Sequence, residues 1–530
     1  MIPGTWIPVS SAVQVDGLKP SAEGTILGYV TDGAWAAFGP FDFADGLVDR
    51  VEVQYAAPAS NGHIEFRLDT PDGPAISKLD IQQTGDYNTY RVVQGDCEQL
   101  AETHRLFVVF RGGDDLCNIK AFRFLKPGQK GDPRAIDPAQ KPAAGDTQTE
   151  IETILAANQE AIEKNRTAMI TLQTPPDAVV KVKQIRHAFE FGTAINRRAF
   201  VPNDRLNEAE QTKYKEILKA NFNSVVHENA MKWYSNEKER DVLTFSDAEA
   251  MLDWCEQNGL FTRGHCVYWG RDNLVQGWLK ELDDASLREE IKERAHDYFR
   301  HFKDRVHEHD MNNEMVHCHY YKNRLGADIR KQMFDWCHEL DPQARLYVND
   351  YSILSGGATG KYIEQIKGFL AAGMPVGGIG VQGHFGGHVN GPAVKEKLDQ
   401  LAQFGLPIKV TEFDANTKDQ QAKAKALATL YITAFAHPAV EGVYMWGFWE
   451  KSHWRPNAAL WNADWSETLA AKTYRDLVFK RWWTDYQGQA NRVGHCDIRV
   501  FYGEHEVTVN GHTRRITVGK HEKDKLLDFR

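Results

Sequence analysis

The feature that most constrains the fold is a regular alternation of short apolar runs and amphipathic helices from about residue 188 onward. One helical segment has apolar residues at i, i+3, i+4, i+7 and i+8, namely Leu427, Leu430, Tyr431, Ala434 and Phe435. Eight runs are predicted as strands: 188–195, 223–229, 261–269, 306–315, 345–351, 377–385, 407–414 and 442–450. Eight strand–helix units over about 295 residues are typical of a (β/α)8 (TIM) barrel, an α/β fold.

The competing α/β architecture is a doubly wound open sheet. Such a sheet is expected to have a glycine-rich phosphate turn after its first strand. The sequence has no such turn after residues 188–195. The barrel is therefore the favoured fold for this part of the chain.

The N-terminal part of the chain follows a different pattern. Residues 1–125 contain short alternating runs, such as 50–56 and 105–111, separated by Gly, Asp, Asn and Pro clusters. This pattern predicts a β-sandwich. Residues 126–147 are rich in Pro, Gly, Asp, Lys and Ala, and are predicted to be a linker because they cannot bury a core.

The catalytic barrel domain is assigned to residues 148–485, and it starts with a helix near 148–167 and a strand pair near 179–185. Residues 486–530 return to strand alternation, with Asn510-Gly511 as a hairpin turn. We expect this tail to form a small C-terminal β appendage.

Composition excludes several classes of protein. The chain has 63 Lys and Arg against 73 Asp and Glu, a net charge of −10, which argues against nucleic-acid or anionic-membrane partners held by bulk electrostatics. No window approaches the roughly 18 apolar residues of a membrane span. The seven cysteines never form a C-x-x-C pair, which disfavours a thiolate zinc site and a disulfide scaffold. The 14 tryptophans would suit sugar stacking, although a large aromatic core gives the same count.

Polar side chains gather at the predicted carboxyl ends of the strands, where the active site of a TIM barrel lies. Glu314 and Glu412 end strands four and seven and would face each other across the mouth of the barrel. Glycoside hydrolysis needs such a pair, one carboxyl protonated and one ionised, on the two sides of a sugar ring. The alternative is that each glutamate only pairs with a neighbouring helix.

Seven ordered motifs between residues 185 and 483 resemble glycoside hydrolase family 10, the endo-β-1,4-xylanases, and most closely the branch known from plants. The motifs are HENAMKW (227–233), RGHCVYW (263–269), MNNEMVH (311–317), LYVNDYS (346–352), GIGVQGH (378–384), VTEFD (410–414) and MWGFWEKSHWR (445–455).

The resemblance implies a retaining mechanism with a covalent glycosyl-enzyme intermediate. Glu314 would be the general acid and base and Glu412 the nucleophile, with their carboxyl groups about 5 to 5.5 Å apart. Asn313 would hydrogen-bond the 2-hydroxyl of the sugar at the cleaved bond. His384 would orient the nucleophile, and Gln382 would lie beside the acid.

The same resemblance implies how the substrate is held. Trp446 and Trp454 would cover the sugar ring at the cleavage point, and Asp414 would support the loop of the nucleophile. The wall of the glycone subsites would be formed by Glu228, Asn229, Lys232, His265 and Trp269.

Two positions depart from the family pattern. Gly270 replaces a histidine and Ala230 replaces a glutamate that are common in the family. Both positions line or support the glycone side. We hypothesise that their small side chains loosen a subsite or admit an arabinose or glucuronic acid branch.

The N-terminal domain resembles carbohydrate-binding module family 6 in the stretches 28–35, 64–74, 84–90 and 106–124. The resemblance implies a sugar clamped at Tyr29, Tyr87 and Asn118. The usual tryptophan is Tyr87 here, which should weaken the stacking. A purely structural sandwich is the alternative.

The cluster His307, His309, His317, Cys318 and His319 is disfavoured as a metal site because its spacing is not H-E-x-x-H and its members would face different ways. We expect no metal and no cofactor.

The predicted function is endo-hydrolysis of xylan, with or without branches. The alternatives are a β-1,4-glucan or mixed-linkage glucan hydrolase, or a non-catalytic carbohydrate-binding protein. We expect a monomer that is secreted, periplasmic or on the cell surface, with its leader absent from the sequence given.

Overall fold

The structure is a computed structural model that describes residues 3–21, 24–43, 48–58, 62–84, 87, 89–98, 100, 102–113, 116–132, 147–520, 522 and 524–530. The chain divides into two compact units, of which the first contains Met1–Thr149 and the second nearly all the rest. Most of the predicted linker, residues 133–146, lies outside the described residues.

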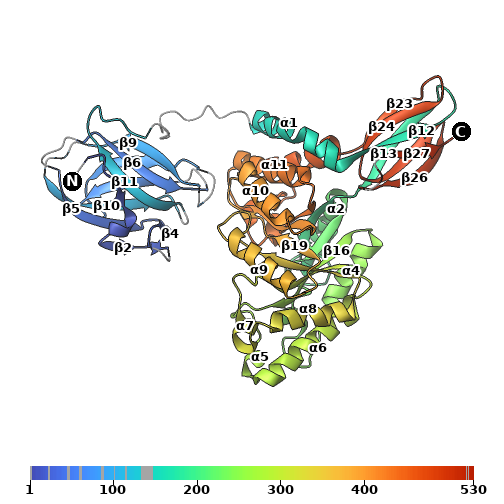
Figure 1. Ribbon diagram of the computed structural model, residues 1–530, viewed down its shortest axis with the longest axis horizontal. Helices are drawn as coiled ribbons and strands as arrows, with labels where there is room; N and C mark the ends of the chain where they lie inside the picture. Colours follow the sequence, from blue (N-terminus) through green and yellow to red (C-terminus); the bar gives the residue numbers. More distant parts are fainter. Residues whose placement is uncertain are drawn as a thin grey trace. The chain divides into compact units, whose positions relative to one another are not determined.

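The first unit is a sandwich of two antiparallel sheets, as the sequence predicts (Figure 1). One sheet has the order β3 (Lys19–Pro20), β4 (Leu27–Gly28), β11 (Asn118–Leu125), β6 (Arg50–Ala56) and β9 (Arg91–Asp96), with β1 (Ile7–Pro8) on β11. The other has the order β2 (Gln14–Asp16), β5 (Trp35–Asp42), β10 (Thr103–Arg111), β7 (His63–Leu68) and β8 (Ala75–Asp80). Edge-to-face contacts of Phe38, Phe66, Phe122 and Phe124 join the two sheets in one core.

The second unit contains the predicted barrel of eight parallel strands. The strands are β14 (Glu190–Ile195), β15 (Ser224–His227), β16 (Phe261–Trp269), β17 (Glu308–Asn313), β18 (Arg345–Asp350), β19 (Gly378–Val381), β21 (Ile408–Ala415) and β22 (Val440–Met445). Pairing of β19 with β21 and of β14 with β22 closes the barrel. A short strand, β20 (His384–Phe385), lies beside β21.

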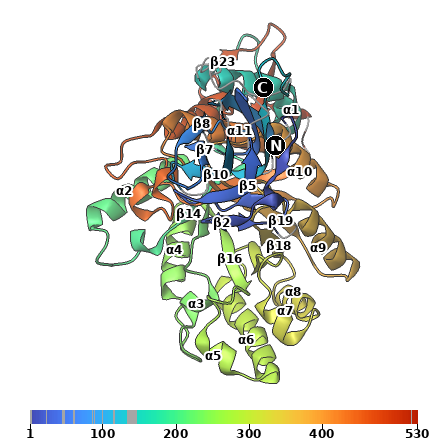
Figure 2. The same cartoon turned by 90° about the vertical axis from the view of Figure 1, so that its left-hand side faces the viewer.

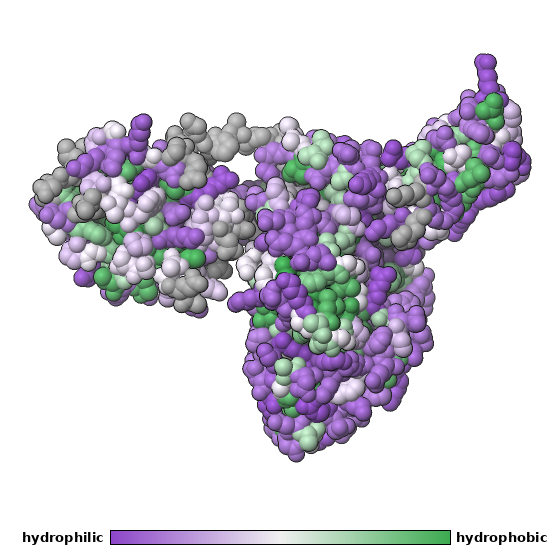
Figure 3. Space-filling model, in the orientation of Figure 1, coloured by the Kyte–Doolittle hydropathy of each residue, from purple (hydrophilic) through white to green (hydrophobic). Residues whose placement is uncertain are grey.

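A helix follows each barrel strand. These helices are α2 (Glu208–Asn221), α4 (Ser246–Gln257), α6 (Asp284–Phe302), α8 (Ile329–Leu340), α9 (Thr359–Ala371), α10 (Gly391–Ala402), α11 (Gln420–Ala436) and α12 (Leu469–Asp476). Figure 2 shows α4, α6, α8 and α9 outside the strands, and Figure 3 shows hydrophilic residues over most of the visible face of this unit. Among the described helices, none is long and apolar enough to cross a bilayer.

Seven strands build the appendage as two small sheets. One sheet has the order β24 (His495–Phe501), β12 (Thr167–Gln173) and β27 (Asp524–Asp528). The other has the order β23 (Asp485–Gln489), β13 (Val179–His187), β25 (Gly503–Val509) and β26 (His512–Val518).

The appendage hairpin turns at Asn510-Gly511, as predicted, with φ values of 49° and 87° at these residues. Strands β12 and β13 come from residues 167–187, which were predicted to belong to the barrel domain. They pair instead with the C-terminal tail because every second side chain is buried in the core that the two sheets share.

A buried ion network fills the amino-terminal end of the barrel. The Lys409 ammonium, with no exposed surface, contacts the carboxylates of Glu190 at 2.6 Å and of Glu308. Arg263 binds Asp310 through two hydrogen bonds, of 2.7 and 2.5 Å. Buried charges persist only when they are paired in this way.

We expect Lys409→Met to lower the free energy of unfolding by about 3–5 kcal/mol, because it removes the cation that pairs with Glu190 and one of the cations that pair with Glu308 inside the barrel. Urea unfolding followed by circular dichroism measures this loss. The control is Lys395→Met, which breaks an exposed pair with Asp399 and should change stability by about 0.5 kcal/mol or less. Equal losses of unfolding free energy in Lys409→Met and Lys395→Met would contradict a stabilising role of the buried ion network.

Candidate active site

Glu314 stands directly after β17 with a φ of 62°, a conformation that is uncommon for a residue other than glycine. Its backbone N–H donates to the carbonyl of Asn349 at 2.8 Å, which holds this turn in place. The buried carboxyl group accepts hydrogen bonds from Trp269 Nε1 at 2.9 Å and from Gln382 Nε2 at 3.0 Å. Strained backbone of this kind is often found at functional sites.

Glu412 lies on β21 and is also buried. Its Oε2 is 3.2 Å from His384 Nε2, and its Oε1 accepts a hydrogen bond from Asn349 Nδ2 at 3.0 Å. The same Asn349 nitrogen donates to Asn313 Oδ1 at 2.9 Å. Asn349 therefore hydrogen-bonds both Asn313, the residue before Glu314, and the carboxylate of Glu412.

His384 lies between two carboxylates. Its Nδ1 is 2.8 Å from Asp414 Oδ2, and its Nε2 faces Glu412. Burial opposes a charge on the ring, but the carboxylates of Asp414 and Glu412 outweigh it and raise the pKa of His384 to about 9. At neutral pH the imidazolium therefore donates a hydrogen bond from each nitrogen.

Asp414 is the centre of a second set of donors. It accepts hydrogen bonds from Trp454 Nε1 at 3.0 Å and from Arg455 Nη1 at 3.2 Å in addition to His384. Burial favours the neutral acid, but His384 and Arg455 outweigh it and hold the pKa of Asp414 below its usual value. Asp414 thus supports both His384 and the Trp454 ring.

The predicted glycone wall comes together at the ends of β15 and β16. Asn229 Oδ1 accepts hydrogen bonds from Tyr234 Oη at 2.8 Å and from Lys232 Nζ at 3.1 Å. Lys232 Nζ also lies 4.6 Å from the centre of the Trp269 ring. Since Trp269 donates to Glu314, the wall is continuous with the carboxyl pair.

Glu228 and His265 are the other two residues predicted to form this wall. Glu228 accepts a hydrogen bond from Asn196 Nδ2 at 2.8 Å. His265 contacts Asp310 at 2.8 Å and packs edge-on against Trp446, with 5.0 Å between ring centres. Trp446 is only 7% exposed, whereas Trp454 is 47% exposed, with the Arg455 guanidinium 4.1 Å from the centre of its ring.

Sequence reasoning gave no role to four residues that contact the site: Asn349, Asp310, Arg455 and Cys318. Asn349 lies within the family motif LYVNDYS (346–352) and Arg455 closes the last family motif, so both carried a signal. The Cys318 thiol lies 3.6 Å from Glu314 Oε2, and burial and Glu314 raise its pKa to about 12. Cys318 is therefore a thiol that can donate weakly to Glu314, and not a thiolate.

The two departures from the family pattern differ in their surroundings. A Cβ at Gly270 would stand 3.2 Å from the ring of Tyr321, a tight contact that a side chain could make only if this ring moved slightly. Ala230 instead lines a pocket with Glu228 and Asn229.

Among the described residues, no group of three or more side chains could hold a metal ion. The histidines near Glu314 have separate partners. His309 contacts Tyr298, His317 contacts Asp350, and His319 contacts Arg330.

In the N-terminal unit the structure brings together the three residues predicted to bind sugar. Asn118 Nδ2 donates to the backbone carbonyl of Tyr87 at 2.9 Å, and its side chain lies against Gly28, the neighbour of Tyr29. The Tyr29 ring is 70% exposed. Their sugar-binding role stays a prediction.

A closed TIM barrel with two buried glutamates at the ends of its fourth and seventh strands is the arrangement of a glycoside hydrolase. The model of glycosyl hydrolase family 10 matches residues 182–477, more than half of the chain, and that of carbohydrate binding module (family 6) matches residues 9–126. The chain belongs to glycosyl hydrolase family 10, and the two matches confirm the two resemblances noted in the sequence.

Several characterised proteins are similar to this chain. The anti-sigma-I factor RsgI6 of Acetivibrio thermocellus is 37% identical over 334 residues, covering 63% of this chain and 42% of that protein. Endo-1,4-beta-xylanase 1 of Arabidopsis thaliana is 38% identical over 336 residues, covering 63% of this chain and 34% of that protein. The chain thus spans less than half the length of these relatives.

Solved structures agree on the fold. Xylanase 10B from Thermotoga petrophila RKU-1, in complex with xylobiose, is 27% identical with a TM-score of 0.51, covering 56% of this chain and 95% of that one. Native xylanase 10B from Thermotoga maritima is 26% identical with a TM-score of 0.51, covering 56% of this chain and 96% of that one.

The pKa of His384 predicts a pH-dependent stability. Because this pKa rises from 6.5 in the unfolded chain to about 9 in the folded protein, the stabilisation is complete below pH 6.5 and is lost as the pH rises through about 9. We expect the difference in Tm between wild type and His384→Gln to shrink over this window, as measured by calorimetry. The exposed His338→Gln is the control, and a constant difference for His384→Gln would contradict the assignment.

Proposed function

We propose that the barrel hydrolyses internal β-1,4-xylosidic bonds of xylan with retention of configuration. The observation that carries this proposal is the pair of buried glutamates, each held by its own donors. Glu314 is held by Trp269 and Gln382, and Glu412 by His384 and Asn349. Membership of family 10 and similarity to a xylanase solved with xylobiose support the choice of substrate.

In the first step Glu314 gives its proton to the oxygen of the leaving sugar while Glu412 attacks the anomeric carbon. The glycosidic bond breaks and a covalent glycosyl ester forms on Glu412. In the second step Glu314 takes a proton from water, which attacks the same carbon and releases Glu412. Two inversions give net retention.

The neighbouring side chains position these groups. Asn349 donates to Asn313 Oδ1, which leaves the amide nitrogen of Asn313 to donate to the 2-hydroxyl of the sugar. The His384 imidazolium holds the Glu412 carboxylate from the other side. Two alternatives remain for the tests to distinguish. The substrate is a linear β-1,4-glucan or a mixed-linkage glucan, or the barrel binds sugar without catalysis.

We expect Glu314→Ala to lower kcat on unactivated xylo-oligosaccharides by roughly 10²–10⁴-fold, because protonation of the leaving group is lost. Glu412→Ala should abolish turnover because no covalent step remains. Initial products followed by proton NMR should be the β-anomer in the wild type.

The exposed helix residue Glu396, changed to Ala, is the matched control and should keep full activity. Full activity in both site variants would refute the site, and α-anomeric initial products would refute retention. Faster turnover of β-glucan than of xylan would identify the glucan alternative.

We also propose that the N-terminal module binds the polysaccharide through the exposed Tyr29 ring. In the Glu412→Ala background, Tyr29→Ala should weaken binding to insoluble xylan about three- to tenfold, the amount expected for one lost stacking contact. Val13→Ala, another exposed apolar side chain of the module, is the control. Unchanged binding in Tyr29→Ala would favour a purely structural sandwich.

We further propose that the protein works as a monomer outside the cytoplasm, as a secreted, periplasmic or cell-surface enzyme. A polymeric substrate does not cross a bilayer, which supports this location. Cell fractionation and light scattering test the two statements.

A further inference from the structure

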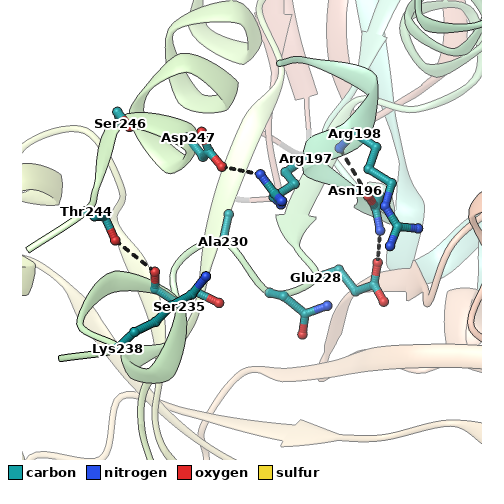
Figure 4. Close-up of a pocket in the computed structure, with 11 residues that line it drawn as sticks. Asn196, Arg197, Arg198, Glu228, Ala230, Ser235, Lys238, Thr244, Ser246 and Asp247 are labelled. Atoms are coloured by element: carbon teal, nitrogen blue, oxygen red, sulfur yellow. Dashed lines mark hydrogen bonds and ion pairs between the residues drawn. The ribbon is translucent and has the colours of Figure 1, made fainter. Parts of the chain in front are cut away.

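A pocket of about 400 Å³ adjoins the glycone wall (Figure 4). Its volume falls within the range of about 300–1,000 Å³ that small-molecule sites occupy. Two of its lining residues, Glu228 and Asn229, belong to the predicted sugar-binding wall, so a chain of sugars bound there borders the pocket. The full lining is Asn196, Arg197, Arg198, Glu228, Asn229, Ala230, Ser235, Lys238, Thr244, Ser246 and Asp247.

The pocket carries more positive than negative charge. It is lined by three cations, Arg197, Arg198 and Lys238, and by two carboxylates, Glu228 and Asp247. Arg197 Nη1 pairs with Asp247 at 2.6 Å, and Glu228 accepts from the Asn196 amide. Within the described part of the chain, Arg198 and Lys238 have no carboxylate partner.

The shape of the pocket depends on a small residue. Figure 4 shows Ala230 between Arg197 and the loop of Ser235 and Lys238. A side chain longer than that of alanine would fill part of this pocket, and a carboxylate at this position would repel an anion. Alanine leaves the space open and without charge.

We propose that this pocket binds a uronic-acid branch carried by the polysaccharide on the glycone side of the cleaved bond, with its carboxylate held by Arg198 and Lys238. The inference rests on the proposed function, because it assumes a sugar chain along the glycone wall. It assigns these cations to substrate selection and gives them no part in bond cleavage.

The charges favour an acidic branch over a neutral one. An arabinose branch presents only hydroxyl groups, which Ser235, Thr244 and Ser246 could meet without any cation. A carboxylate would pair with two cations that have no carboxylate partner among the described residues, and hydrogen bonds to charged groups are the stronger class. The hydroxyl groups of the pocket remain available to the ring of the same branch.

The test compares three oligosaccharides of one backbone length: linear, uronic-acid-substituted on the glycone side, and the same branch after reduction of its carboxyl to an alcohol. We expect the wild type to have a roughly tenfold higher kcat/KM for the acidic branch than for the reduced one. Arg198→Gln/Lys238→Gln should remove this preference and leave turnover of the linear substrate within twofold. The preference of the wild type should also fall in high salt.

Arg205→Gln is the matched control, because Arg205 is an exposed cation of the same loop that does not line the pocket. It should keep the wild-type preference. Equal kcat/KM for the acidic and reduced branches in the wild type, or an unchanged preference in the double variant, would overturn the inference.

The inference and the proposed function fail in different ways. If the wild type did not hydrolyse the linear oligosaccharide, the proposed function would be refuted. In the Glu412→Ala protein, calorimetry with the acidic and reduced oligosaccharides measures the pocket without hydrolysis. Tighter binding of the acidic form, lost in Arg198→Gln/Lys238→Gln, supports the pocket, and equal affinities overturn it.

Discussion

Closure of the barrel is the constraint on which the rest of the structure depends. Parallel pairing of β19 with β21 and of β14 with β22 brings eight strand ends to one mouth, although β14 ends at Ile195 and its neighbour β22 begins only at Val440. Inside the closed barrel, charges such as Lys409 and Arg263 are excluded from water and must be paired. The same closure holds Glu314 and Glu412 in a buried, shared polar network.

That network joins catalysis to substrate binding through few side chains. Asn349 contacts both Asn313 and Glu412, and Trp269 contacts both Glu314 and Lys232. The glycone wall therefore cannot shift without moving a ligand of the catalytic pair. The pocket lined by Arg198 and Lys238 adjoins this wall at Glu228 and Asn229. A branch bound in this pocket would not displace the two catalytic glutamates.

Much of the fold was readable from the sequence. The eight strands, their helices and the hairpin at Asn510-Gly511 follow from local periodicity and turn chemistry. The appendage was only half predicted, because β12 and β13 pair with strands more than 290 residues later. Local alternation identifies a strand, but it contains no information about a partner so distant in the chain.

The sequence by itself determined the fold class, the family and the two glutamates, because strand spacing and motif order are properties of residues close together in the chain. Tertiary structure alone decided that Asn349 and Cys318 also contact those glutamates, since Asn349 lies on β18 and Cys318 lies in the segment after β17. It also decided that Gly270 lies close to the Tyr321 ring, whereas Ala230 lines a pocket. Such differences depend on packing between segments, and no local pattern encodes them.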